Sequence, residues 1–380
     1  MQRFCLLLFC AAFLTAPASG APASAAFLCD SAHTGVCPET EIAAQPKPLW
    51  RFFTDRLNRS TPAYHNGVLF VGSNSGMFYA LDAQAGRPRW SFAAHEPVAS
   101  SPAVSGGRVY FAAARALYAL DERNGRPVWR HAFGPDVPHP GHQWDFFQSS
   151  PSVVASKIFV GSGDGSIDAL DAATGRLIWT YRTGGRVRST PAVWDGVVYA
   201  GSFDGAVYAL NEQTGALLWR FKTAGNPDFP IGEVQSSPSV AGGTVFFGSR
   251  DGFLYAVDAR TGTKKWSVDE NESWVISSPA VQGGVVYYGS SDGNALRAVD
   301  EATGTRKWSY DAQGRVWSSP VLDGGRVFIG AGDGEVWIVD AATGKMSAYL
   351  DSEGTIYSSV CVAEGSVFYT SDDGYVYAAR

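Results

Sequence analysis

Four arginines lie one or three residues before copies of a recurring Ser-Ser/Thr-Pro motif, at Arg59, Arg186, Arg188 and Arg315. A guanidinium group forms paired hydrogen bonds with carboxylates and stacks on aromatic rings. Matching positions in the other copies hold polar or aromatic side chains, namely Gln148, Glu233, Gln235, Trp274, Trp317 and Tyr357. If the copies converge on one point, these residues form a binding site for an anionic or aromatic ligand, or for a peptide. The alternative is a solvated, variable rim.

Two segments are longer than the repeat requires, at 134–148 and 225–235. Such loops are common places for function. The first contains a run of aromatic and acidic side chains, Trp144, Asp145, Phe146 and Phe147. We interpret this run as a patch for a protein partner, because aromatic residues dominate binding energy at interfaces. Changing Trp144, Phe146 and Phe147 together to alanine is expected to abolish partner binding.

Other chemistries find little support in the residues. The chain has no CxxC or CxxCH spacing, so neither a zinc site nor a c-type haem is indicated, and we predict no metal site. The formal net charge is −6 and no basic cluster follows the N-terminus, which argues against nucleic acid as a partner.

The N-terminus has the pattern of a secretory signal peptide. Arg3 precedes an apolar run from Phe4 to Thr15, and small residues follow it. We therefore predict a signal peptide at 1–26 and an exported protein, periplasmic or secreted, that has no transmembrane segment once the signal is cleaved. Cys29 is preceded by Phe27 and Leu28, which is a poor match to a lipid-attachment motif.

Export exposes cysteines to oxidation. Cys29 and Cys37 bracket a short polar loop, and we predict a disulfide between them that contributes about 2.5 kcal/mol by restricting the unfolded chain. Cys361 falls in a predicted strand and is expected to be a buried free thiol.

A repeat of about 40 residues organises the rest of the chain. Each copy holds the Ser-Ser/Thr-Pro motif, short β-branched and aromatic runs separated by glycine-rich turns, and then an Asp or Asn that precedes a tryptophan. This pattern predicts four antiparallel strands per copy, which is typical of a propeller blade. The Ser-Ser-Pro segment is predicted to be the innermost strand. The seventh copy has Ala348 in place of the tryptophan.

The two ends of the chain are predicted to share a blade. Three strands follow the seventh copy, and the fourth strand signal stands at the N-terminus, where Trp50 lies 40 residues before Trp90. An N-terminal strand that completes the last blade gives eight blades and removes the exposed edges. Deleting 27–55 should then open the ring, whereas deleting 27–45 should be mild. The predicted organisation is a signal at 1–26, an arm at 27–48 and an all-β, eight-bladed propeller at 49–380.

The recurring tryptophans are interpreted as structural. An indole at one fixed place per blade fills the gap to the neighbouring blade, and its N–H can donate to a backbone carbonyl there. These blade-docking residues are Trp50, Trp90, Trp129, Trp179, Trp219, Trp266 and Trp308. The recurring Asp is expected to hold the turn that follows it.

The segment Ala-Leu-Asp-Ala-Ala-Thr-Gly-Arg-Leu-Ile-Trp at 169–179 resembles the tryptophan-docking repeat of quinoprotein, or pyrroloquinoline-quinone-like, propellers. The resemblance extends over 49–380, and the signatures of WD40 and kelch repeats are missing. It implies one of two functions. Quinoprotein dehydrogenases hold the quinone and a calcium or lanthanide ion in the central funnel, whereas BamB-type propellers carry no cofactor and serve outer-membrane protein assembly as scaffolds.

The length and blade count resemble the BamB type, and no set of metal ligands or adjacent-cysteine disulfide can be matched to the dehydrogenases. The expectation is therefore a non-catalytic binding scaffold of the cell envelope, monomeric alone, with a protein or peptide partner and no cofactor. The alternative is a small dehydrogenase that uses pyrroloquinoline quinone and calcium.

Overall fold

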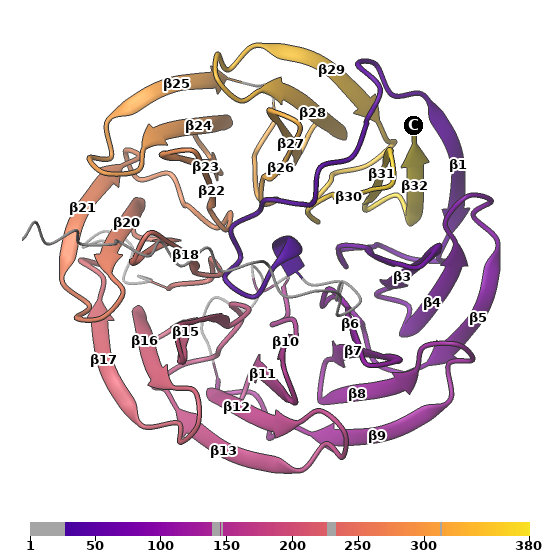
Figure 1. Ribbon diagram of the computed structural model, residues 1–380, viewed down its shortest axis with the longest axis horizontal. Coiled ribbons are helices and arrows are strands. Elements are labelled where there is room, and N and C mark those ends of the chain that lie inside the picture. Colours follow the sequence, from indigo (N-terminus) through magenta and orange to yellow (C-terminus); the bar gives the residue numbers. More distant parts are fainter. Residues whose placement is uncertain (1–26, 139–144, 146, 226–232, 312–313) are drawn as a thin grey trace, which may run out of the picture.

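The computed structural model describes residues 27–138, 145, 147–225, 233–311 and 314–380. Within these residues the chain forms eight four-stranded antiparallel sheets, arranged as blades around a central axis (Figure 1). The predicted eight-bladed β-propeller is therefore confirmed. In the described part of the chain, no helix has the length and apolar character needed to cross a membrane.

Blades 1 to 7 each contain four consecutive strands, starting with β2–β5, and blade 8 contains β30–β32 together with β1. The innermost strands are β2 (Ala63–His65), β6 (Ala103–Ser105), β10 (Ser152–Val154), β14 (Ala192–Trp194), β18 (Ser239–Ala241), β22 (Ala280–Gln282), β26 (Val321–Asp323) and β30 (Cys361–Ala363). The second strands are β3 (Val68–Gly72), β7 (Arg108–Ala113), β11 (Lys157–Gly161), β15 (Val197–Ser202), β19 (Thr244–Gly248), β23 (Val285–Ser290), β27 (Arg326–Gly330) and β31 (Ser366–Thr370).

The third strands are β4 (Met77–Asp82), β8 (Ala116–Asp121), β12 (Ser166–Asp171), β16 (Ala206–Asn211), β20 (Phe253–Asp258), β24 (Ala295–Asp300), β28 (Glu335–Asp340) and β32 (Tyr375–Ala379). The outermost strands are β5 (Pro88–Ala93), β9 (Pro127–Ala132), β13 (Leu177–Arg182), β17 (Leu217–Lys222), β21 (Lys264–Asp269), β25 (Arg306–Asp311), β29 (Met346–Asp351) and β1 (Pro48–Phe53). The second and third strands are almost wholly buried, because neighbouring blades pack on both of their faces.

The Ser-Ser/Thr-Pro segments were predicted to be the innermost strands, but those strands begin only after these segments. Each starts directly after the proline or valine of the Ser-Ser/Thr-Pro motif, as Ala63 follows Pro62. A proline has no N–H to give to a ladder, so the strand begins behind it. The second residue of each Ser-Ser/Thr pair lines a cavity on the axis, whereas a first residue such as Ser100 donates its hydroxyl to the second strand of its own blade.

Strand β1 closes the ring. It pairs antiparallel with β32, with Trp50 opposite Ala378 and Phe52 opposite Val376, and Figure 1 shows β1 and β32 side by side in one blade. The predicted closure by the N-terminal strand is confirmed.

Tryptophans join neighbouring blades. Each indole N–H donates to a backbone carbonyl of the next blade at 2.9–3.1 Å, as Trp179 does to Glu212. Each ring also lies on a glycine in the turn before that blade's outermost strand, so close that a Cβ on Gly215 would sit 2.6 Å from the Trp179 ring.

The absence of a tryptophan in blade 7 has a structural reason. The next blade is the shared one, and its third strand, β32, and its outermost strand, β1, are not consecutive along the chain. No turn connects these two strands, so an indole at Ala348 would have neither a glycine nor a turn carbonyl to dock on. Instead, Cys37 and Ile42 of the N-terminal arm belong to the core cluster against which Ala348 packs.

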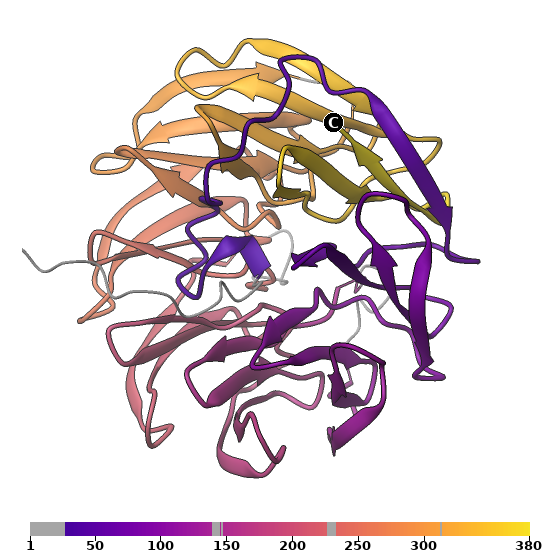
Figure 2. The ribbon, with the colours of Figure 1, turned by 45° about the vertical axis from the view of Figure 1, so that its right-hand side comes forward.

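The N-terminal arm, residues 27–47, enters the centre of the ring. A short 3-10 helix, η1 (Phe27–Cys29), lies near the axis, and the arm runs from it across several blades to β1 (Figures 1 and 2). Arm carbonyls accept from the amides of Val193, Val240, Val281 and Leu322 at 2.7–2.9 Å. Leu28 and His33 are buried. Deleting 27–45 would remove these hydrogen bonds and uncover the blade residues that the arm buries. We therefore expect the deletion to lower stability more than was predicted from the sequence.

Cys29 and Cys37 are bonded to each other, as predicted. Cys361, which begins β30, is the free cysteine of the described chain, as predicted, but it is half-buried rather than buried. The predicted signal peptide at 1–26 lies outside the described residues.

Candidate functional site

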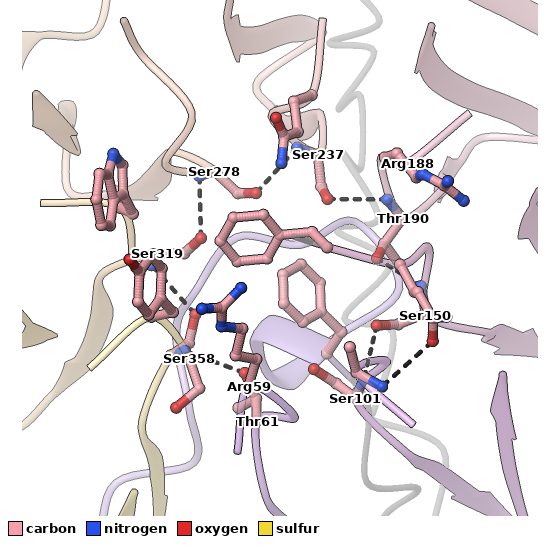
Figure 3. A pocket seen from close by; sticks show the side chains of 18 of the residues that line it. Arg59, Thr61, Ser101, Ser150, Arg188, Thr190, Ser237, Ser278, Ser319 and Ser358 are labelled. Atoms are coloured by element: carbon pink, nitrogen blue, oxygen red, sulfur yellow. Dashed lines mark hydrogen bonds between the residues drawn. The ribbon is translucent and has the colours of Figure 1, made fainter. Parts of the chain in front are cut away.

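Hydroxyl groups form a ring around the axis. In every blade but blade 2, the second residue of the Ser-Ser/Thr pair accepts a hydrogen bond from the backbone N–H of its counterpart in the neighbouring blade. Seven such bonds, at 2.9–3.2 Å, connect Thr61, Ser101, Ser150, Thr190, Ser237, Ser278, Ser319 and Ser359 (Figure 3). A Ser or Thr is needed at this place because its oxygen satisfies an amide that the innermost strand cannot pair.

A small cavity lies next to this ring on the axis. Side chains one residue before the Ser-Ser/Thr pairs line it, together with Phe27 of the arm. They include six of the predicted funnel residues: Arg59, Gln148, Arg188, Gln235, Trp317 and Tyr357. The space is about 60 Å³, which accommodates a few water molecules.

Aromatic rings and guanidinium groups stack at the cavity wall. The rings of Trp317 and Tyr357 are parallel, with centroids 4.6 Å apart. The Arg59 guanidinium lies 4.3 Å from the Tyr357 centroid, and that of Arg315 lies 5.6 Å from the Trp317 ring. Four of the predicted residues, from three blades, therefore form one continuous stack.

Acidic residues hold both ends of this stack. Arg59 donates two hydrogen bonds to Asp372, at 2.8 and 3.1 Å, and Arg315 forms an ion pair with Asp292, with Nε 3.0 Å from Oδ1. Both aspartates lie in the turns between the second and third strands. The stacked cations are thus positioned by ion pairs and present their aromatic neighbours in one orientation.

The other two arginines converge on Asp145. Arg186 donates to it at 2.6 Å, and Arg188 donates to it at 2.7 Å and to Asp136 at 2.7 Å. Burial would lower the pKa of Arg188, but the bonds to Asp145 and Asp136 outweigh burial and raise it. The Asp145 side chain is 4% exposed. It is therefore bound to the arginines of the ring and is not available for contact with a partner.

A buried pair occupies the wall of blade 5. Arg250 donates to Glu233 at 2.5 Å and also to Gln235, and its guanidinium lies 4.8 Å from the Trp274 ring. Burial raises the pKa of Glu233 to about 7, although the charge of Arg250 opposes the shift. Glu233, Arg250 and Trp274 are thus held in the wall, and they are not among the residues that line the cavity.

Phe147 leaves the position that the repeat predicts. In six blades the residue two places before the Ser pair is a Val or Ile packed on a glycine of the preceding blade, as Val187 packs on Gly161. Blade 2 has Ala112 in place of that glycine, and its methyl group occupies the space. Phe147 lines the cavity instead, with its ring 6.3 Å from Tyr357. Trp144 and Phe146, the other aromatic residues of the predicted partner patch, lie outside the described residues.

Sequence reasoning missed several parts of the site. Asp136, Arg250, Asp292 and Asp372 hold the predicted residues in place, and Phe27 comes from the arm. The substitution of Ala112 for a glycine was a readable signal for the displacement of Phe147. No sequence pattern indicated the pairing of Arg59 with Asp372, because the two residues are 313 positions apart.

The residues present do not fit a quinone cofactor with its metal ion. The cavity is far smaller than the roughly 300 Å³ of ordinary ligand pockets. The carboxylates described above, those of Asp145, Glu233, Asp292 and Asp372, are each paired with arginine. Within the described residues, no three His, Cys, Asp or Glu side chains are grouped to hold a metal ion.

The closed eight-bladed ring, its docked tryptophans and its axial hydroxyl ring define a quinoprotein-like β-propeller. The sequence matches the family described as outer membrane protein assembly factor BamB over residues 41–139, 114–269, 204–316 and 231–380. The chain belongs to this family.

Known structures of both functional types share the fold. BamB from Moraxella catarrhalis has 21% identity and a TM-score of 0.71, and the match covers 88% of this chain and 97% of that one. Quinohemoprotein alcohol dehydrogenase from Comamonas testosteroni has 15% identity and a TM-score of 0.78, with 93% and 79% covered. These similarities show the fold and do not separate the two types.

One curated relative is similar in sequence over a shorter stretch. The dehydrogenase subunit of the alcohol dehydrogenase (quinone) of Gluconobacter oxydans is 28% identical over 166 residues, which is 38% of this chain and 22% of the relative.

Proposed function

We propose that this protein is a non-catalytic binding scaffold of the cell envelope, similar to BamB-type propellers, which binds a protein or peptide partner at the mouth of the ring. The mouth is the axial face that carries Arg59, Phe147, Arg315, Trp317 and Tyr357. The observation that carries the proposal is the cavity itself: it holds only a few waters, and the charges around it are paired with one another. The mouth therefore provides an outer surface for a partner rather than a pocket for a small ligand.

The composition of this surface suits a protein partner. Trp, Tyr and Arg are the residue types that contribute most at interfaces. Trp317, Tyr357 and Arg59 are half-buried, so their exposed parts are already oriented by stacking and ion pairs. Such preorganisation lowers the entropy lost on binding. No cofactor is needed for this role.

The proposal includes an exported protein. Residues 1–26 act as a signal peptide, 27–48 form the arm and 49–380 form the propeller. After cleavage the chain is periplasmic or secreted, and monomeric until it meets its partner.

A quinone-dependent dehydrogenase is the second candidate. Its support is the 28% identity to the Gluconobacter oxydans subunit over part of the chain. The cavity volume and the paired carboxylates count against it. The two candidates predict different binding of quinone and calcium.

Cross-linking tests the scaffold proposal. Cells that express the tagged protein are cross-linked, and the captured partners are identified. The wild type is compared with the mouth variant Trp317→Ala/Tyr357→Ala and with an outer-strand control, Leu217→Ala/Leu218→Ala. The controls are exposed residues of β17. We expect the mouth variant to lose a specific cross-linked product that the control retains. Equal products from all three would contradict binding at the mouth.

A further inference from the structure

The N-terminal arm shows how the innermost strands bind an extended chain. In blades 4, 5 and 6, an arm carbonyl accepts from the amide of the central residue of the innermost strand, for example Ser31 O from Val193 N at 2.7 Å. In blade 7 the arm also donates, from Cys37 N to Leu322 O at 3.1 Å, and Val36 forms a parallel bridge with Leu322. Backbone bonds of this kind need no particular side chain on the bound segment.

The arm does not cover the equivalent edges of blades 8 and 1. The corresponding amides belong to Val362 in β30 and Tyr64 in β2. In the part of the chain that the structure describes, no group outside its own sheet accepts from the Val362 amide. The Tyr64 amide faces the Cys361 thiol, which is a weak acceptor. An extended chain could therefore continue the pattern set by the arm.

A groove runs along these two edges. It has a volume of about 340 Å³ and lies between the Cys29–Cys37 disulfide on one side and the two strands on the other. Its apolar walls include Pro38, Pro62 and Val360. This volume is typical of a ligand site.

Two polar groups of the groove indicate what would bind there. Thr40 lines the groove, and its hydroxyl oxygen is buried without a hydrogen-bond partner among the described residues, a state that costs free energy. Glu364 is the charged residue of the lining and is exposed, in the hairpin after β30. A basic residue next to an apolar run would complement it.

We propose that this groove binds an extended, apolar peptide segment of a partner protein, with a basic residue at one end, by backbone pairing with β30 and β2. The segment would extend the half-ring that the arm makes with blades 4 to 7. The groove shares Thr61 with the axial cavity but none of the mouth residues, so this site goes beyond the proposed function.

The test uses the full-length mature protein and a fluorescein-labelled probe, acetyl-Ser-Val-Ala-Val-Ala-Lys-amide. We expect saturable binding by fluorescence anisotropy, and binding at least about 10-fold weaker for a probe with Glu in place of Lys. Ala363→Trp fills the groove from the third residue of β30 and should weaken binding at least about 10-fold. Blade 4 already has Trp194 at this place in its innermost strand, so the fold accepts the substitution.

Ser105→Trp is the matched control, because Ser105 is the third residue of β6 in blade 2. It should bind the probe as wild type does, and so should the mouth variant Trp317→Ala/Tyr357→Ala. Equal melting temperatures would show that both tryptophan variants are folded. The proposal is overturned if wild type shows no saturable binding, if Ala363→Trp binds as tightly as Ser105→Trp, or if decanoate binds the groove and the peptide does not.

Discussion

At the residue scale, His33 links the arm to two blades. Its Nδ1 lies 3.1 Å from the carbonyl of Pro238 and its Nε2 lies 3.3 Å from the Ser152 hydroxyl. The carbonyl can only accept, so Nδ1 carries the proton of the neutral ring. Burial lowers the pKa of His33 to about 4, although Asp30 and the Pro238 carbonyl act in the opposite direction.

This shift predicts that acid weakens the docking of the arm. The folded protein binds fewer protons than the unfolded chain between pH 6.5 and 4, so the contribution of His33 is complete above pH 6.5 and lost as the pH falls through that window. The contribution of His33 to the free energy of unfolding is about 3 kcal/mol smaller at pH 4 and below than at pH 6.5 and above. In His33→Asn, the free energy of unfolding from urea titrations should fall less between pH 6.5 and 4 than in wild type. Parallel pH profiles for the two proteins would contradict this assignment.

Cys361 should be an unreactive thiol in the folded protein. Burial raises its pKa to about 12, so the thiolate fraction at pH 8 is about 10⁻⁴, against roughly a quarter for an ordinary cysteine. We expect N-ethylmaleimide to label Cys361 at least about 100-fold more slowly before unfolding than after it. Mass spectrometry of the labelled, non-reduced protein should also show the Cys29–Cys37 loop intact. Rapid labelling of the native protein would show that the thiol is accessible.

At the element scale, the docked tryptophan is the unit that joins one blade to the next. Trp179 is buried and bonded to the following blade, whereas Tyr349, next to the position that lacks a tryptophan, is 52% exposed. Trp179→Ala should therefore cost about 3–5 kcal/mol of unfolding free energy. Tyr349→Ala should change it by no more than about 0.5 kcal/mol. Denaturant titrations of both variants measure the contrast, and similar losses would argue against indole docking.

The arm and β1 stabilise the ring in different ways. Deleting 27–45 removes the buried arm residues but leaves β1 paired with β32, so we expect a lower melting temperature and a monomeric, cooperative fold. Deleting 27–55 also removes β1 and exposes the edge of β32, which favours association between molecules. Size-exclusion chromatography and thermal unfolding separate the two outcomes. Equal behaviour of both truncations would mean that β1 does not close the ring.

At the scale of the whole molecule, the axial channel is filled from both ends. Phe27 enters from the arm and Phe147 from a loop of the mouth, and both line the same small cavity. A quinone cofactor would have to displace them and compete with arginines for the acidic residues. We therefore expect calorimetry to show no binding of pyrroloquinoline quinone at micromolar concentrations, with or without calcium. Micromolar binding that requires calcium would favour the dehydrogenase instead.

Much of the fold could be predicted because each blade is encoded locally. The glycine turns, the strand runs and the docking tryptophans recur within about 40 residues, and Trp50 revealed the missing strand of blade 8. The alternation before the Ser-Ser/Thr pairs also placed Arg59, Trp317 and Tyr357 at the cavity, since side chains alternate along an extended segment. These features depend on short-range spacing, which a sequence displays directly.

Only the tertiary structure decided how the site is completed. The pairs of Arg59 with Asp372 and of Arg188 with Asp145 join residues 313 and 43 positions apart, and they exist because ring closure and loop folding bring those residues together. The path of the arm along the innermost strands could not be predicted from the sequence either. It rests on backbone hydrogen bonds to blades 4 to 7, and such bonds leave no mark in the side-chain pattern. The groove beside blades 8 and 1 lies where the arm no longer pairs with the innermost strands.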